Sequence, residues 1–241
     1  MRQTTLRLPE PPGSRHGHWS ISVPASASTT PLARPALRVL MVGDSSMAGV
    51  GAGHQSEALS GALGLVLEDA PKHDDAPRLQ VQWQLIARTG LRTREMVDLL
   101  AGPARPQGCD AVEPFDLALV ALGVNDATAL QSAAAFRRDV ARLDRQLRMQ
   151  QGVRRVLWSG LPPVHRFPAL PQPLRGVLGR KAIELDAVLR ELDQDYLPMP
   201  AQLESHWIAA DGFHPGPPAY AAWARQMAPG LREACVALAT A

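Results

Sequence analysis

The chain has 241 residues, of which 46% are hydrophobic and 20% are charged. This is enough apolar material for one packed domain. The formal net charge is only +2 and aromatic residues make up 5%, so we expect no nucleic-acid partner, which would need a basic or base-stacking surface. No apolar run reaches the roughly 18 residues of a membrane-spanning helix, and no apolar stretch follows the N-terminal arginines as in a secretory signal. We therefore expect no stable membrane insertion and a cytoplasmic location.

The first 36 residues are rich in proline and small polar residues and show no sustained periodicity. This composition predicts a flexible or irregular N-terminal arm at 1–36, followed by one domain at 37–241. The apolar run at 37–42 ends in Gly43, which is typical of a buried parallel strand. A helical pattern then extends from about residue 54 to residue 69.

The rest of the chain continues to alternate between the two periodicities. We expect strands at 79–87, 115–122, 153–158 and near residue 197, and helices at 92–100 (with Thr93 as a possible cap), 129–150, 174–196 and 217–237. This order predicts an α/β fold with three layers, α/β/α, around a central parallel sheet of about five strands. Ligands in such sheets bind beyond the carboxyl ends of the strands.

Ser45 lies in Gly43-Asp44-Ser45-Ser46, between the first strand and the helix that follows it. Unpaired amides and the dipole at a helix N-terminus favour the negative charge that an attacking serine oxygen acquires. Ser and Asp are also preferred helix caps. Taken by itself, this segment favours a cap over a nucleophile.

Asp211 precedes His214 by three residues in Asp211-Gly212-Phe213-His214-Pro215. One short loop can therefore supply a carboxylate that fixes the tautomer of an imidazole, whose other nitrogen can take a proton from a serine. The same residues, taken alone, are explained somewhat better as a surface loop with an Asp-capped turn.

Asn125 and Gly90 follow two other expected strands. The Asn125 amide could donate a hydrogen bond at the sheet edge, as an oxyanion hole requires, or could simply form a turn. Gly90 could bring a backbone N–H close to a ligand, or could only permit a turn.

Considered together, four segments bring suitable groups to one edge of the sheet. The motifs are Gly43-Asp44-Ser45-Ser46, Gly90, Gly123-Val124-Asn125-Asp126 and Asp211-Gly212-Phe213-His214-Pro215, in that order. Over about residues 37–236 the chain strongly resembles the SGNH or GDSL hydrolase superfamily, with Ser46 where the family often has leucine. The stretch from Arg166 to Leu174 also resembles a segment of some bacterial members.

The resemblance implies a flavodoxin-like fold and a serine esterase. Ser45 would be the nucleophile, His214 the general base and Asp211 the residue that orients His214. The backbone N–H groups of Ser45 and Gly90 and the side chain of Asn125 would form the oxyanion hole. Ser46 is a less favoured rival nucleophile because it lies one step further into the helix.

The expected substrate is a small, short-chain carboxylic ester, cleaved through an acyl-enzyme intermediate. The sequence contains no long insertion or lid domain, which favours short chains. Three residues of the proline-rich loop at 162–173, His165, Phe167 and Leu170, could form the wall of a substrate pocket, although loop packing explains them equally well. Trp207, which precedes the Asp211 loop, could line the same cleft. No histidine shows metal-ligand spacing, so we expect neither a metal nor another cofactor.

Two further functions compete with this interpretation. Gly43-Asp44 and Asn125-Asp126 loosely resemble blocks of metal-dependent phosphoester hydrolases, but the chain lacks the Asp-x-His opening and later paired histidines. A non-catalytic domain that binds esters or acylated sugars is the second. Acyl transfer to an alcohol, the oligomeric state, the role of residues 1–36 and the pairing of Cys109 with Cys235 stay open, although we interpret both cysteines as buried thiols.

Overall fold

The computed structural model describes residues 6–23, 36–68, 78–102, 114–200 and 202–240. Its centre is a six-stranded sheet with the strand order β1-β3-β2-β4-β5-β6. The strands are β1 (His16–Ser22), β2 (Ala36–Gly43), β3 (Arg78–Ala87), β4 (Leu117–Ala121), β5 (Arg155–Ser159) and β6 (Tyr196–Leu197). Neighbours from β3 to β6 are parallel, whereas β1 is antiparallel to β3.

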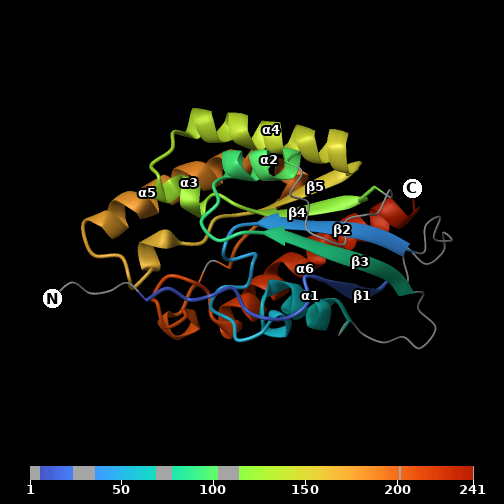
Figure 1. Cartoon of the computed structure of the whole chain (residues 1–241), viewed down its shortest axis with the longest axis horizontal. Helices are drawn as coiled ribbons and strands as arrows, with labels where there is room; N and C mark the ends of the chain where they lie inside the picture. The colour runs from blue at the N-terminus through green and yellow to red at the C-terminus, as the bar shows by residue number, and fades with distance from the viewer. Residues whose placement is uncertain (1–5, 24–35, 69–77, 103–113, 201, 241) are drawn as a thin grey trace.

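Helices cover both faces of this sheet (Figure 1). The α-helices are α1 (Leu59–Glu68), α2 (Thr93–Ala101), α3 (Val124–Thr128), α4 (Ala133–Gln151), α5 (Leu174–Arg190) and α6 (Pro217–Thr240), and the short 3₁₀ helices are η1 (Gln55–Glu57), η2 (Val164–Arg166), η3 (Asp193–Asp195) and η4 (Ser205–Trp207). In Figure 1, α2, α4 and α5 lie above the sheet, and α1 and α6 lie below it. The predicted three-layer α/β/α fold is confirmed.

The central strands are apolar because both of their faces are covered. In β2, Val39 and Met41 pack into the core shared with α1 and α6, whereas Leu40 and Val42 pack into the core shared with α2, α4 and α5. All five residues of β4 are buried as well. The period-2 alternation of a strand thus supplies two separate cores from one short segment.

The prediction of a flexible or irregular N-terminal arm at 1–36 is wrong for residues 16–22. Residues 16–22 form β1, which pairs with β3 and turns the expected parallel sheet of about five strands into a mixed sheet of six. Trp19 and Ile21, at alternate positions, are buried, and the Trp19 indole N–H donates to the Ser60 carbonyl oxygen at 3.1 Å. Because serines and prolines surround these two residues, the alternation is too short to predict a strand from the sequence. Residues 1–5 and 24–35 of the expected arm lie outside the described residues.

Three helix boundaries also differ from the prediction. The helix expected at 129–150 begins at residue 133, where Ser132 caps α4 by accepting from Ala135 N at 3.3 Å, and α3 precedes it. The helix expected at 174–196 ends at residue 190, before η3 and β6, and the start of the helix expected at 54–69 is η1. The cap of α2 is Arg92, paired with Glu95 in a capping box, rather than Thr93.

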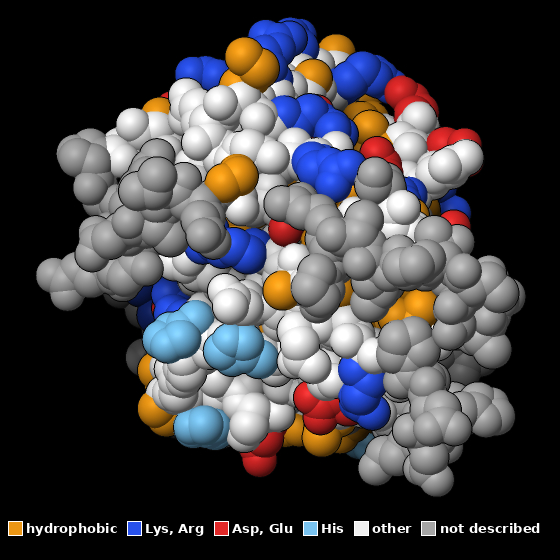
Figure 2. Space-filling view, turned by 90° about the vertical axis from the view of Figure 1, so that its right-hand side faces the viewer, with side chains coloured by type: hydrophobic (Ala, Val, Ile, Leu, Met, Phe, Trp, Pro, Cys, Tyr) orange, Lys and Arg blue, Asp and Glu red, His pale blue; other side chains and the backbone are white. Residues whose placement is uncertain are grey.

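One of the two cysteines lies within the described residues. Cys235 is buried, and burial raises the pKa of its thiol to about 12, whereas Cys109 lies outside the described residues. Within the described ranges, no helix is both long and apolar enough to cross a bilayer. On the face shown in Figure 2, Lys and Arg side chains are spread over several places with acidic ones between them.

Candidate active site

Ser45 lies just beyond the carboxyl end of β2, in the turn that follows Gly43. A Cβ added to Gly43 would overlap Met47 and the carbonyl oxygen of Ala121, so only glycine allows the chain to turn so closely beside β4. Ser45 is 6% exposed. Its hydroxyl oxygen lies 2.9 Å from His214 Nε2.

His214 is held by the loop that precedes α6. Its Nδ1 lies 2.5 Å from Asp211 Oδ2, and Asp211 Oδ1 accepts from the backbone N–H groups of Phe213 and His214, both at 3.0 Å. Burial opposes ionisation of Asp211, but these hydrogen bonds outweigh it and hold the pKa of its carboxyl below the usual value. The loop thus presents an ionised carboxylate to one side of the imidazole.

The three side chains form one hydrogen-bonded chain, although Ser45 and His214 are 169 positions apart in the sequence. With its Nδ1 proton directed at Asp211, the imidazole offers the Nε2 lone pair to the Ser45 hydroxyl. Such an arrangement can withdraw the hydroxyl proton as the oxygen attacks an electrophile.

Ser46, the rival nucleophile, has different surroundings. Its backbone N–H donates to Asp44 Oδ1 at 3.0 Å, and its carbonyl oxygen accepts from the Tyr220 hydroxyl at 3.0 Å. Among the described residues, no imidazole lies within hydrogen-bonding distance of its hydroxyl. The geometry therefore favours Ser45 over Ser46.

The backbone N–H groups of Ser45 and Gly90 lie in the turns after two neighbouring parallel strands, β2 and β3. Within the described part of the chain, neither the amide of Ser45 nor that of Gly90 donates to a protein acceptor. Gly90 has φ = +84°, and a Cβ added to it would have nothing within 4 Å. Glycine is needed there for its backbone conformation and not for lack of space. Unpaired amides of this kind can stabilise an oxyanion.

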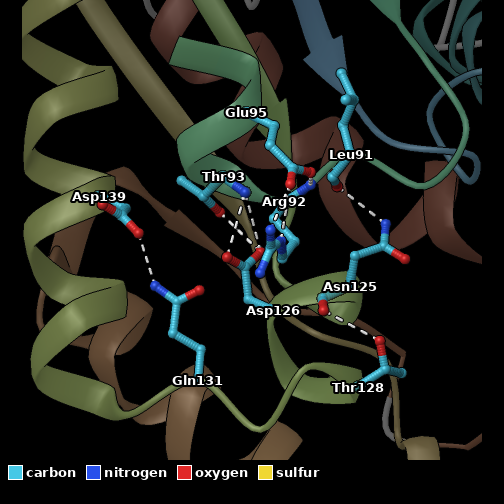
Figure 3. Close-up of polar contacts among 9 residues, drawn as sticks. All are labelled: Leu91, Arg92, Thr93, Glu95, Asn125, Asp126, Thr128, Gln131 and Asp139. Carbon is cyan, nitrogen blue, oxygen red and sulfur yellow. Dashed lines mark hydrogen bonds and ion pairs between the residues drawn. The ribbon is translucent and has the colours of Figure 1, made fainter. Parts of the chain in front are cut away.

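Asn125 lies at the start of α3, and its amide nitrogen is already engaged. Nδ2 donates to the carbonyl oxygen of Leu91 at 3.0 Å (Figure 3) and to Asp44 Oδ2 at 3.2 Å. Asn125 is thus at the expected edge, but it would have to share or exchange one of these acceptors in order to donate to an oxyanion.

The contact between Asp44 and Asn125 is not predicted by the sequence. Asp44 is 2% exposed, and its burial raises the pKa of the carboxyl to about 6, against the opposing hydrogen bonds from Ser46. In the sequence, only the position of Asp44 next to Ser45 suggests that it lies at the site. That position does not indicate which side chain its buried carboxylate contacts.

Asp126 connects the turn after β3 with the turn after β4. It is fully buried and accepts from the backbone N–H of Thr93 at 3.1 Å and from its hydroxyl at 3.0 Å (Figure 3). Burial raises the pKa of Asp126, and the hydrogen bonds from Thr93 oppose that rise. The segments that carry Gly90 and Asn125 are therefore joined through buried polar groups.

A pocket with mostly apolar walls opens beside His214. Its walls come from the ends of β2, β4 and β5, from the loops after β5 and β6, and from α6: Asp44, Ser46, Ala121, Leu122, Val124, Gly160, Leu161, Pro162, Pro163, Phe167, Met199, Pro200, Leu203, Trp207, Ile208, Phe213, His214, Pro215, Ala219 and Trp223. Phe167 and Trp207 were expected in such a wall. His165 and Leu170 do not line it: His165 is exposed on η2, and Leu170 packs against the core shared with α2, α4 and α5. Within the described residues, no group of three or more His, Cys, Asp or Glu side chains could hold a metal ion.

Comparison with known proteins agrees with this architecture. Residues 41–222 match the GDSL-like lipase/acylhydrolase family. A GDSL-like esterase of Mycobacterium tuberculosis is 27% identical over 179 residues, which are 67% of this chain and 56% of that protein. The match thus spans little more than half the length of that relative.

Two solved structures show the same fold. The lipase Lip_vut3 from a goat rumen metagenome has a TM-score of 0.59 at 19% identity, and the match covers 82% of this chain and 97% of the lipase. A variant of Axe2, an acetyl xylan esterase from Geobacillus stearothermophilus, has a TM-score of 0.54 at 15% identity, with 81% and 94% covered. At these identities the likeness concerns the fold alone.

Proposed function

The chain belongs to the GDSL-like lipase/acylhydrolase family, and on this basis we propose that it is a serine esterase that hydrolyses small, short-chain carboxylic esters. The observation that carries the proposal is the hydrogen-bonded chain from Asp211 through His214 to the Ser45 hydroxyl. No other serine hydroxyl in the described residues is bonded to a histidine whose second ring nitrogen is bonded to a buried carboxylate.

The reaction would proceed in two steps. Ser45 Oγ attacks the ester carbonyl carbon while His214 Nε2 takes the hydroxyl proton, and the carbonyl electron pair moves onto the oxygen. The bond to the alcohol oxygen then breaks, and the alcohol leaves with the proton from His214. Water, deprotonated by the same imidazole, attacks the carbonyl carbon of the acyl-enzyme. The bond from that carbon to Ser45 Oγ then breaks, Ser45 Oγ takes the proton back from His214, and the carboxylic acid leaves.

The backbone N–H groups of Ser45 and Gly90 would stabilise the oxyanion, with Asn125 as the third donor. Two observations support this role: the first two amides have no protein acceptor among the described residues, and Asn125 is tied to the segment that carries Gly90 through Leu91. Preorganised donors of this kind usually supply the largest single contribution to acyl transfer.

The pocket beside His214 would hold the apolar part of the ester. Bulky side chains are among those that line it, including Phe167, Trp207 and Trp223. Trp223 is fixed because its indole N–H donates to Ser159 Oγ at 3.0 Å. A site with such rigid walls favours short acyl chains. The printed names of relatives, a GDSL-like esterase and an acetyl xylan esterase, agree with ester hydrolysis.

The test is a series of p-nitrophenyl esters from acetate to palmitate, with wild type and Ser45→Ala. We expect turnover that falls beyond short chains and only background turnover in Ser45→Ala. Ser56→Ala, which alters an exposed serine whose hydroxyl bonds the His54 ring, is the matched control and should keep full activity. Rates that rise toward palmitate would contradict the short-chain assignment.

Two measurements separate the competing functions. A fluorophosphonate should label wild type and not Ser45→Ala, because it captures only an activated serine; failure to label wild type would favour a non-catalytic binding domain. Ester turnover should be unchanged by EDTA. Loss of activity in EDTA together with phosphoester turnover would favour metal-dependent phosphoester hydrolysis.

A further inference from the structure

The segment before β1 lies on the side of the molecule where the proposed site is found. Residues 6–15 precede the family match, which begins at residue 41, and run past the edge toward which the parallel strands point (Figure 1). The backbone of the segment is held in two places. Gln55 N donates to the Pro12 carbonyl oxygen at 2.9 Å, and Leu85 N donates to the Arg15 carbonyl oxygen at 2.7 Å.

Glu10 connects this segment to the turn after β3. One carboxylate oxygen, Oε1, accepts from the Thr89 backbone N–H at 2.9 Å and from the Thr89 hydroxyl at 2.8 Å. The other, Oε2, accepts from Arg15 Nη2 at 3.0 Å. Thr89 directly precedes Gly90, whose amide is one of the proposed oxyanion donors.

Apart from the hydrogen bond that the Leu91 carbonyl oxygen accepts from Asn125 Nδ2 at 3.0 Å, the turn that carries Gly90 has few other restraints. Arg88, Thr89 and Gly90 are all exposed, so packing does not fix their conformation. The nearby backbone bonds are long: Arg88 N donates to the Gly43 carbonyl oxygen at 3.2 Å, and Leu91 N donates to the Arg88 carbonyl oxygen at 3.4 Å. The two bonds to Glu10 are shorter than either. A donor to a developing oxyanion is effective only if it is already in place.

We propose that Glu10 is a positioning residue, which holds the Thr89–Gly90 turn so that the Gly90 amide faces the oxyanion. The proposal rests on the proposed esterase function and extends it to a part of the chain that the family match does not include. Arg15 offsets the charge of the Glu10 carboxylate, so the segment supplies an acceptor to Thr89 without leaving a lone negative charge beside the oxyanion.

The test compares Glu10→Ala with Glu10→Gln on p-nitrophenyl acetate. Glu10→Ala removes the acceptor of both Thr89 bonds, and we expect kcat to fall about 10-fold, which is less than the loss of a whole oxyanion donor, while KM changes less than twofold. Glu10→Gln keeps one acceptor oxygen that can reach Thr89 and should recover most of kcat. A purely structural role would give no such split between kcat and KM and no rescue by the amide.

A second readout follows the oxyanion hole directly. The phosphonyl oxygen of a fluorophosphonate occupies the same place as the ester oxyanion, so its rate of reaction with Ser45 should fall in Glu10→Ala by about the same factor as kcat. Glu57→Ala is the matched control, because Glu57 also accepts a loop backbone N–H, that of Gly53, at 3.0 Å. It should leave both rates unchanged.

The outcomes keep the two proposals apart. If wild type is labelled and active, Ser45→Ala is inactive and Glu10→Ala equals wild type in both rates, the role of Glu10 is overturned and the esterase stands. If wild type is neither labelled nor active on any ester, the esterase function fails, and the role of Glu10 fails with it.

A milder variant decides the question if circular dichroism shows that Glu10→Ala is unfolded. Thr89→Val removes only the hydroxyl bond to Glu10 and keeps the backbone bond. The loss of one hydrogen bond that holds the turn should lower kcat and the labelling rate together by about 3-fold. Rates equal to those of wild type in folded Thr89→Val would overturn the role of Glu10.

Discussion

The two sides of the proposed site are built in different ways. On the proton-transfer side, Asp211, His214 and Ser45 contact one another directly, at 2.5 and 2.9 Å. On the oxyanion side, Gly90 is an exposed glycine at the tip of a turn, and the Asn125 amide already donates to two protein acceptors. The proton-transfer side is held by contacts among its own three side chains, whereas the donors on the oxyanion side depend on other residues for their positions.

The difference is also visible in two buried aspartates. Asp211 receives hydrogen bonds from the His214 ring and from two backbone N–H groups, which lower the pKa of its carboxyl in spite of burial. Asp44 is more completely buried, and desolvation raises the pKa of its carboxyl to about 6. Asp44 also accepts hydrogen bonds, from Ser46 and Asn125, so its more complete desolvation, and not a lack of donors, gives the opposite shift.

The largest expected effect tests the proton-transfer side. Asp211→Asn keeps the shape of the side chain but presents an amide to His214 Nδ1, so the imidazole would adopt the wrong tautomer. We expect kcat on p-nitrophenyl acetate to fall by roughly 10³–10⁴. Asp144→Asn, at a half-buried position of α4 where the carboxylate pairs with Arg148, is the control. A loss of less than about 10-fold in Asp211→Asn would mean that this carboxylate does not orient His214.

The next effect tests the oxyanion side. Asn125→Ala should lower kcat by roughly 10²–10³, because it removes one donor and also frees Leu91 and Asp44 from their contact with the amide. Gln131→Ala removes a nearby amide whose side chain bonds Asp139 (Figure 3), and it should change kcat less than twofold. If kcat stays intact in Asn125→Ala, the amide serves only the acceptors it already has.

The smallest effect concerns Asp44 and stability. Between pH 3.8 and about 6 the folded chain keeps a proton on Asp44 that the unfolded chain has released. The stability linked to the neutral carboxyl is therefore present below that window and lost as pH rises through it, by about 2–3 kcal/mol. Urea unfolding of wild type and Asp44→Asn at pH 4 and pH 8 measures this. The free energy of unfolding of wild type, relative to the variant, should be lower at pH 8, and an equal difference at both pH values would refute the shifted pKa.

The sequence predicts the fold well where periodicity is strong. The continuous apolar run of β2 and the alternation in β3 both indicate the strands that the structure contains. β1 is not predicted because only Trp19 and Ile21 indicate its buried face, among serines and a glycine. Its partner β3 also lies far along the chain, with Ser22 opposite Arg78. Such a pairing depends on tertiary contacts, which a local pattern does not contain.

For the site, motifs are sufficient to indicate which residues meet, but not what supports them. Ser45, Asp211 and His214 can be identified because the short segments that contain them occur together and in the order of one family, although neither segment is decisive alone. The contacts of Glu10 with Thr89 and of Asp44 with Asn125 join segments 79 and 81 residues apart. No spacing rule connects them, since they arise from the way the loops pack after the strands are in place.

Strand β1 also has a consequence for how chains meet one another. It covers the free edge of β3, where Leu79 and Val81 are buried. Without β1, a row of unpaired N–H and C=O groups would lie open beside these apolar side chains, which is a template for pairing with another chain. A variant that begins at residue 37 would expose this edge and self-associate through it. With β1 in place, the outer strand of the sheet has seven residues instead of the ten of β3, so the edge that stays open to another chain is shorter.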